Sequence, residues 1–197
     1  MTRFQVTGDA LWARMERAVQ RIDERLRKTV RILESAKIPY AVVGGHAVRA
    51  WVAQVDEAAV RTTKDVDIQV RPDDLPAVIE AMTSHEFHYR QTAGGDMFVE
   101  ESNASARDAV HLILCGQMVR ADDHDPNPDI EPNVTTHDFR TVSLETLVRM
   151  KLNFFRRKDQ VHLLDMISIG LIDESWPQRF PQSLQKRLQE LLDDPEG

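Results

Sequence analysis

Two aspartates, Asp65 and Asp67, stand two residues apart in the run RTTKDVDIQV, which otherwise has the composition of a β-strand. Side chains at positions i and i+2 of a strand point to the same face, so these two carboxylates are expected to lie side by side. Like charges held that close repel each other unless a cation or a proton lies between them. Carboxylates are typical ligands of Mg²⁺, so the pair predicts a site for Mg²⁺, or for Mn²⁺ in its place. A charged, exposed strand face is the alternative meaning of such a pair alone.

The run AVVGGHAV places Gly44 and Gly45 where an apolar strand ends and a helix is expected to begin. Glycine lets the backbone approach a ligand closely, and the free amide groups at a helix N-terminus favour a phosphate group. The glycine pair therefore predicts a phosphate site, although any tight strand-to-helix turn can also use glycine.

The elements that must position these residues follow from hydrophobic periodicity and from turn residues. The expected order begins with a helix over 9–35, with Asp9 as N-cap, and a strand, glycine turn and helix over 38–54. A strand over 65–70, a helix over 71–82 and three strands within 87–115 follow. An irregular loop over 121–138 and a short strand over 139–144 then lead to helices over 144–155, 159–169 and 181–192. A long helix, mixed strands and helices, and a helical tail predict an α+β fold.

Taken together, the strand that ends in Gly-Gly, the helix after it and the strand with two alternating aspartates resemble the nucleotidyltransferase superfamily. Its polymerase-beta-like palm also builds antibiotic adenylyltransferases and abortive-infection toxins. The segment VSLETLVRMKLNFFRRKDQVHLLDMI is similar to the family's helical segment, with Lys151 ahead of a basic turn. The likeness covers roughly residues 38–172 and is greatest to a bacterial branch with no assigned substrate. We therefore expect a mixed-sheet palm over 37–142, an added long N-terminal helix over 1–36 that packs on it, and a helical segment over 143–197, all in one compact unit.

The resemblance also implies a reaction and a set of roles. The family transfers a nucleotide from a nucleoside triphosphate to a hydroxyl group with the help of two metal ions. Carried over, Asp65 and Asp67 hold Mg²⁺ and are catalytic. The residues expected to bind the nucleotide are Gly44, Gly45, Thr63, Lys64 and Lys151.

One position departs from the family pattern. The family has a third carboxylate on a later strand, and the matching stretch DAVHLILCG has His111 there. Histidine is a poor Mg²⁺ ligand but a competent general base near neutral pH. Either His111 takes the proton of the acceptor hydroxyl and is catalytic, or the fold binds its ligand without reacting. Asp108 lies three residues earlier, so strand alternation places it on the opposite face.

Several charged residues allow two interpretations. Arg149, Lys151, Arg156, Arg157 and Lys158 form a basic segment that either complements a helix dipole or contacts phosphates, and phosphate contact is favoured. His162 and Asp165 are expected to serve as capping or salt-bridge residues. A stripe of basic residues on the first helix indicates a solvated face, or else a surface for transfer RNA or a partner protein of a toxin–antitoxin pair.

Bulk properties limit the remaining classes. The 197-residue chain has a net charge of −7, which argues against a general nucleic-acid coat. Its single cysteine, Cys115, excludes a disulfide framework, and no apolar run approaches the roughly 20 residues that span a bilayer. The N-terminus lacks the pattern of a signal peptide. We therefore expect a cytoplasmic protein with no membrane association. The sequence allows either a monomer or a homodimer.

Overall fold

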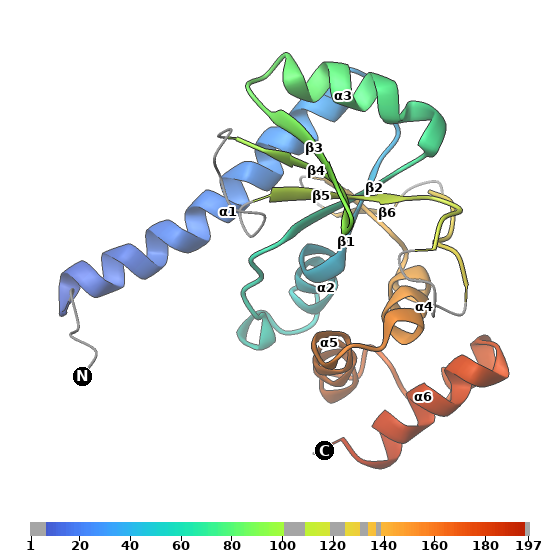
Figure 1. The fold of residues 1–197 in the computed structure, drawn as a ribbon. Helices are drawn as coiled ribbons and strands as arrows, with labels where there is room; N and C mark the ends of the chain where they lie inside the picture. The colour runs from blue at the N-terminus through green and yellow to red at the C-terminus, as the bar shows by residue number, and fades with distance from the viewer. Residues whose placement is uncertain (1–6, 101–108, 119–124, 131–133, 137–138, 196–197) are drawn as a thin grey trace.

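The computed structural model describes residues 7–195 except for the segments 101–108, 119–124, 131–133 and 137–138. Its helices are α1 (Asp9–Ser35), α2 (Gly44–Val52), α3 (Leu75–Thr83), α4 (Leu144–Phe154), α5 (Arg157–Ser168) and α6 (Gln182–Asp193). Its strands are β1 (Ala41–Val43), β2 (Val66–Val70), β3 (His88–Thr92), β4 (Gly95–Val99), β5 (Ala109–Leu114), β6 (Val134–Thr136) and β7 (Phe139–Thr141). This order confirms the predicted α+β fold (Figure 1).

Within the described part of the chain, the strands form one mixed sheet in the order β3-β4-β5-β2-β1-β7-β6. The central strand β2 runs antiparallel to β1 and parallel to β5. Its register pairs Asp67 with Val43 on one side and with His111 on the other. The end of β1, the aspartate pair and His111 are therefore neighbours across three adjacent strands.

Each face of the sheet is covered by a different group of helices. Val66, Ile68 and Val70 of β2 pack into a core with α1 and α3. The alternating residues of β2, which include Asp67, point to the opposite face because successive side chains of a strand alternate. That face packs against α2, α4, α5 and α6, so the aspartate lies on the side of the C-terminal helices.

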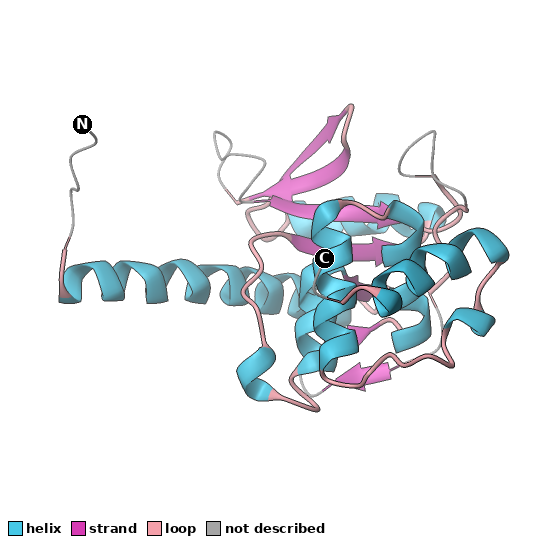
Figure 2. Cartoon of the chain, turned by 90° about the horizontal axis from the view of Figure 1, so that it is seen from below, coloured by secondary structure: helices cyan, strands magenta, loops and turns pink. Residues whose placement is uncertain are grey.

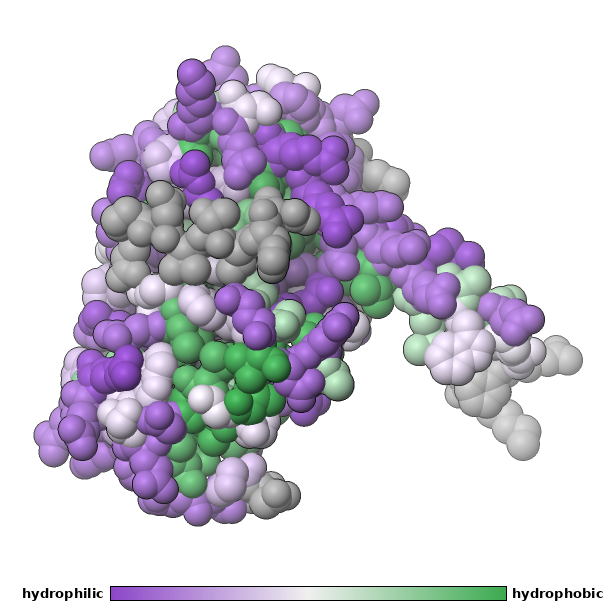
Figure 3. Space-filling view, turned by 180° about the vertical axis from the view of Figure 1, so that it is seen from behind, coloured by the Kyte–Doolittle hydropathy of each residue, from purple (hydrophilic) through white to green (hydrophobic). Residues whose placement is uncertain are grey.

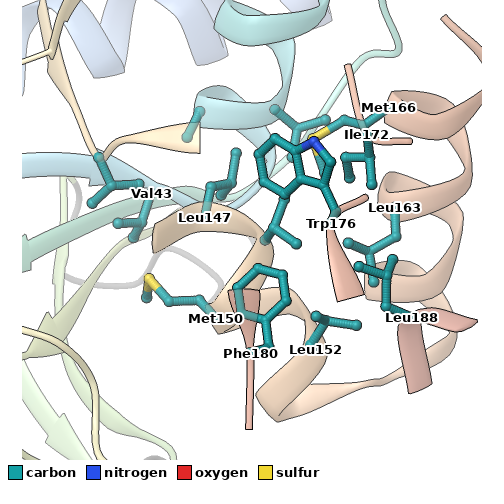
Figure 4. Close-up of a cluster of buried hydrophobic side chains, with 14 of the residues drawn as sticks. Val43, Leu147, Met150, Leu152, Leu163, Met166, Ile172, Trp176, Phe180 and Leu188 are labelled. Atoms are coloured by element: carbon teal, nitrogen blue, oxygen red, sulfur yellow. The ribbon is translucent and has the colours of Figure 1, made fainter. Parts of the chain in front are cut away.

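The core beneath the C-terminal helices is continuous with the sheet. Leu147, Met150 and Leu152 of α4 pack with Val43 of β1, and Leu163, Met166 and Leu188 of α5 and α6 complete the cluster with Trp176 and Phe180 (Figure 4). Burial of these large apolar side chains anchors α4 and α5 on the sheet. The helical tail is thus fixed relative to the aspartate-bearing strand.

The two halves of α1 have different surroundings. Between Arg25 and Leu33 its inner face is buried against the sheet, whereas Leu11, Trp12 and Met15 are 43–64% exposed. Figure 2 shows this first half leaving the body as a free helix, and the space-filling view in Figure 3 shows mixed hydrophobic and hydrophilic residues along it. A single chain therefore leaves part of the apolar stripe uncovered, and a homodimer or a partner protein there stays a prediction.

Three details of the sequence prediction were wrong. Gly8, not Asp9, precedes the first turn of α1, and Asp9 is its first helical residue. Strand β6 lies inside the predicted loop 121–138; it is a three-residue edge strand paired with β7, too short to show a period. Helix α5 begins at Arg157 rather than at residue 159.

None of the described helices combines the length and the apolar composition that a membrane-spanning segment needs.

Candidate functional site

A pocket of about 500 Å³ lies between the aspartate-bearing strand and the α4–α5 pair. The two glycines, Thr63, Lys64, Lys151 and both aspartates line it, as predicted, whereas His111 and two cations of the basic segment, Arg149 and Arg157, do not. The lining residues are Val43, Gly44, Gly45, Thr62, Thr63, Lys64, Asp65, Asp67, Ile113, Leu147, Met150, Lys151, Phe154, Arg156, Lys158 and His162. One wall thus comes from β1, β2, β5, the N-terminus of α2 and the segment before β2, and the other comes from α4, α5 and the turn between them. We call these the strand wall and the helix wall.

On the strand wall, the two glycines allow contacts that no other residue would allow. Gly44 has a φ of 65°, in the left-handed region that favours glycine, and a Cβ atom there would overlap Oδ2 of Asp67. A Cβ atom on Gly45 would likewise overlap Oγ1 of Thr63. The N-terminus of α2 therefore approaches the Asp67 carboxylate and the Thr63 hydroxyl directly, and its free amide groups lie at the pocket.

The two aspartates have different electrostatic surroundings. Burial raises the pKa of Asp67, while the charges of Lys151 and His111 oppose that rise. Asp65 is 38% exposed, and its Oδ2 accepts from Lys158 Nζ at 3.4 Å. Two half-buried carboxylates this close together can hold a positively charged ligand, and the cations of the opposite wall would compete with it.

Asp65 and Asp67 fit a divalent cation as its two protein ligands. Within the described segments, no group of three or more histidine, cysteine, aspartate and glutamate side chains is arranged to hold a metal ion. Asp65 and Asp67 would therefore be the protein ligands. Mg²⁺ commonly keeps several waters and binds through one or two carboxylates plus substrate phosphates, so a two-carboxylate site agrees with its chemistry.

The structure places His111 beside Asp67 rather than on the pocket wall. The two residues are partners in the β2–β5 register, and parallel pairing in register puts their side chains on the same face. Ile113, two residues further along β5, shares that face and lines the pocket. His111 is thus a neighbour of the carboxylate pair.

On the helix wall, a buried ion pair fixes the basic turn between α4 and α5. Lys151 Nζ donates to Asp159 Oδ1 at 2.9 Å, and Arg156 Nε donates to Asp159 Oδ2 at 2.7 Å. Burial lowers the pKa of Lys151. Burial alone would raise the pKa of Asp159, but the hydrogen bond from Arg156 and the charge of Lys151 hold it below its ordinary value. Lys151, predicted to contact a phosphate, therefore lines the pocket with its ammonium group on Asp159.

The predicted basic segment separates into two groups. Lys151, Arg156 and Lys158 line the pocket. Arg149 instead pairs with Asp125 at 3.1 Å, and Arg157 donates to the side chain of Gln160 at 3.3 Å. The favoured interpretation, contact with a phosphate in the pocket, can therefore apply to three of the five cations.

Two features of the helix wall were missed from the sequence. His162, predicted to cap or pair, lines the pocket; burial lowers its pKa to about 4, and its Nδ1 is buried without a hydrogen-bond partner. The apolar side chains Leu147, Met150 and Phe154 form the rest of this wall. His162 lies four residues after Lys158, a predicted phosphate contact, and so shares one face of α5 with it, a spacing that could have indicated His162 as well.

Solved structures with a similar fold include an antibiotic-resistance factor and a nucleotidyltransferase-like protein. The antibiotic-resistance factor ANT(2'')-Ia in solution matches with a TM-score of 0.51 and 12% identity, over 89% of this chain and 91% of that chain. An antigenic nucleotidyltransferase-like protein from Paracoccidioides brasiliensis matches with a TM-score of 0.52 and 18% identity, over 89% and 88% of the two chains. No family model matches the sequence, and no curated protein sequence matches it. The chain is therefore similar to these proteins in its fold.

Proposed function

Because the chain has the nucleotidyltransferase fold, we propose that it transfers a nucleotide from a nucleoside triphosphate to a hydroxyl group in a Mg²⁺-dependent reaction. The observation that carries the proposal is the position of Asp65 and Asp67: both line the pocket, and Gly44 lies directly against Asp67. Two carboxylates beside a helix N-terminus offer a site for a cation next to a site for an anion. A metal-bound triphosphate has both parts.

The residues of the pocket then have distinct roles. The amide groups at Gly44 and Gly45, with the hydroxyl of Thr63 and the cations Lys64 and Arg156, bind the phosphates. The larger hydrophobic side chains of the helix wall offer an apolar surface for the nucleoside. Mg²⁺ held by Asp65 and Asp67, or Mn²⁺ in its place, would neutralise the charge that develops on the transferring phosphoryl group. Lys151 stays paired with Asp159, and its positive charge attracts the phosphates from that position.

In the transfer step, the acceptor oxygen forms a new bond to the α-phosphorus. The bond between that phosphorus and the bridging oxygen of the β-phosphate breaks, and pyrophosphate leaves. The acceptor loses its proton, and His111 beside Asp67 is the candidate base. This assignment gives a function to the residue that replaces the family's third carboxylate.

Release of pyrophosphate tests the proposal. The protein is incubated with ATP, GTP, CTP or UTP and Mg²⁺, together with transfer RNA or an aminoglycoside as two chemically different hydroxyl acceptors. We expect acceptor-dependent pyrophosphate release that falls by about 100-fold or more in Asp67→Asn, a loss typical of removing an electrostatic stabiliser. Release at an equal rate from the wild type and the variant would show that Asp67 takes no part.

A second function is favoured by the same histidine. With two carboxylates rather than three, the site can also serve a binding or regulatory module, free or within a toxin–antitoxin pair, that keeps the phosphate site and has no turnover. This alternative predicts nucleotide binding with no pyrophosphate release on any acceptor. Turnover of the wild type separates the two functions, and turnover that appears only in His111→Asp would favour the binding module, because the site would then lack only the third carboxylate.

A further inference from the structure

Two lysines of the helix wall face the aspartate pair, and they are held in different ways. Lys151 is 3% exposed and is fixed by the buried carboxylate of Asp159. Lys158 is half exposed, with 51% of its side chain accessible, and its ion-pair partner is Asp65 at 3.4 Å. Lys151 therefore cannot move without leaving a buried charge unpaired, whereas Lys158 can exchange one solvated partner for another.

The position of Lys158 creates a competition. Its ammonium group lies 3.4 Å from Oδ2 of Asp65, a carboxylate that would also hold a divalent cation. Two cations cannot share a half-exposed carboxylate at full strength, because each repels the other. In the free protein, the Lys158–Asp65 pair therefore opposes metal binding.

The same ammonium group has a second partner available. Lys158 lines the pocket beside Arg156, opposite the glycines of α2. A triphosphate there would present several negative oxygens within reach of a flexible four-carbon side chain. Charge-assisted hydrogen bonds to phosphate are stronger than a pair to an exposed carboxylate, so the exchange is favourable once both ligands are present.

We propose that Lys158 is a counterion with two successive partners: it neutralises Asp65 in the free protein and moves to the triphosphate when the aspartates hold a divalent cation. Lys158 thereby makes the binding of metal and the binding of nucleotide cooperative. This cooperativity adds to the direct affinity of the metal for the nucleotide. The proposal rests on the proposed function, since it assigns a metal to Asp65 and a triphosphate to the pocket.

The test measures each ligand in turn on the full chain. Mn²⁺ alone is titrated and followed by the electron paramagnetic resonance signal of the free ion, with no nucleotide and at fixed ionic strength. The nucleoside triphosphate that binds the wild type most tightly among ATP, GTP, CTP and UTP is then titrated by calorimetry at saturating Mn²⁺. The variants are Lys158→Met, Lys158→Arg, which keeps the charge, and the control Arg157→Gln, which removes a neighbouring cation outside the pocket.

The expected effects of Lys158→Met have opposite signs. Mn²⁺ alone should bind about threefold more tightly, and the triphosphate should bind about tenfold more weakly, within the range of exposed ion pairs and charged hydrogen bonds. Lys158→Arg should retain most of the wild-type behaviour on both titrations. Arg157→Gln should match the wild type.

Two other outcomes would overturn parts of the account separately. If the wild type binds both ligands but Lys158→Met weakens both, or leaves Mn²⁺ affinity unchanged, Lys158 is not a competing counterion and the proposed function stands. If the wild type and Lys158→Met bind neither Mn²⁺ nor any triphosphate, the proposed function itself fails, and this inference fails with it.

Discussion

The strand wall and the helix wall of the pocket are built by different physical means. On the strand wall, Asp65, Asp67 and the two glycines owe their places to backbone geometry: alternation along β2 and a turn that only glycine fits. On the helix wall, Lys151, Arg156 and Lys158 owe theirs to side-chain partners, Asp159 and Asp65. The strand wall is therefore set by local conformation, and the helix wall by paired charges.

This difference predicts how each wall fails. A substitution on the strand wall should alter binding wherever it adds atoms, since the backbone leaves no room. A substitution on the helix wall should act mainly through the partner that it leaves behind, because an unpaired buried charge costs more than the pair contributes.

The largest effect is expected for Asp159→Asn on the helix wall. This change leaves the ammonium group of Lys151 buried without a carboxylate, so the free energy of unfolding should fall by about 3–5 kcal/mol. Urea denaturation measures the loss. The double variant Lys151→Met/Asp159→Asn should recover part of it, because the orphaned charge is removed as well. A loss below about 1 kcal/mol in the single variant would show that the pair does not hold the wall.

On the strand wall, Gly44→Ala is expected to be next. The left-handed backbone and the overlap with Asp67 Oδ2 together should cost about 3 kcal/mol of unfolding free energy and abolish nucleotide binding. Gly170→Ala is the matched control, since Gly170 also has a positive φ, of 75°, but open space around a Cβ atom. It should lose only the backbone part, about 1–2 kcal/mol, and bind normally. Equal losses in the two variants would rule out the close approach at Asp67.

A histidine of α2 and a histidine of the helix wall have lowered pKa values. Burial lowers the pKa of His46, just behind the glycines, and of His162 to about 4. Between about pH 6.5 and pH 4 the unfolded chain binds protons that the folded chain does not, so stability should fall as the pH falls through this window.

We expect a contribution of about 2 kcal/mol from each of these two histidines. His162→Gln and His46→Gln should each flatten the difference in stability between pH 7 and pH 4.5, and the exposed His88→Gln should not. A slope that stays at the wild-type value in both buried variants would contradict the lowered pKa values.

The smallest effect is expected at the ion pair that links the walls. Arg61, ahead of the aspartates, pairs with Asp165 of α5 at 2.7 Å but is 64% exposed. Arg61→Gln should therefore cost no more than about 0.5 kcal/mol, and the loss should vanish at high salt. Denaturation at two salt concentrations checks this, and a salt-independent loss would show that Arg61 acts through packing instead.

The same contrast explains how much could be predicted from the sequence. Alternation and the glycine pair are local patterns, so the fold and the grouping of these residues on one wall could be predicted, and their role in binding stays a prediction. On the helix wall, the sequence predicted a basic segment but not which cation meets which carboxylate. That depends on the tight turn at Phe155, whose φ of 44° is unusual for a residue other than glycine and has no local signal.

Other differences have the same origin. His162 reaches the pocket because α5 packs under the turn before β2, a contact between residues far apart in the chain. Helix α1 shows one periodic apolar stripe from Leu11 to Leu33, and periodicity alone cannot tell which half finds a partner. Tertiary contacts decide both cases.

Whether Asp65 and Asp67 form a metal–nucleotide site is tested by a calorimetric titration of ATP, GTP, CTP and UTP, with and without Mg²⁺. It compares the wild type with Asp65→Asn/Asp67→Asn, which keeps the size of both side chains. We expect at least one triphosphate to bind only when Mg²⁺ is present, and we expect the double variant to lose this binding. Binding that is equal with and without Mg²⁺, or that persists in the double variant, would contradict the assignment of the aspartate pair as a metal–nucleotide site.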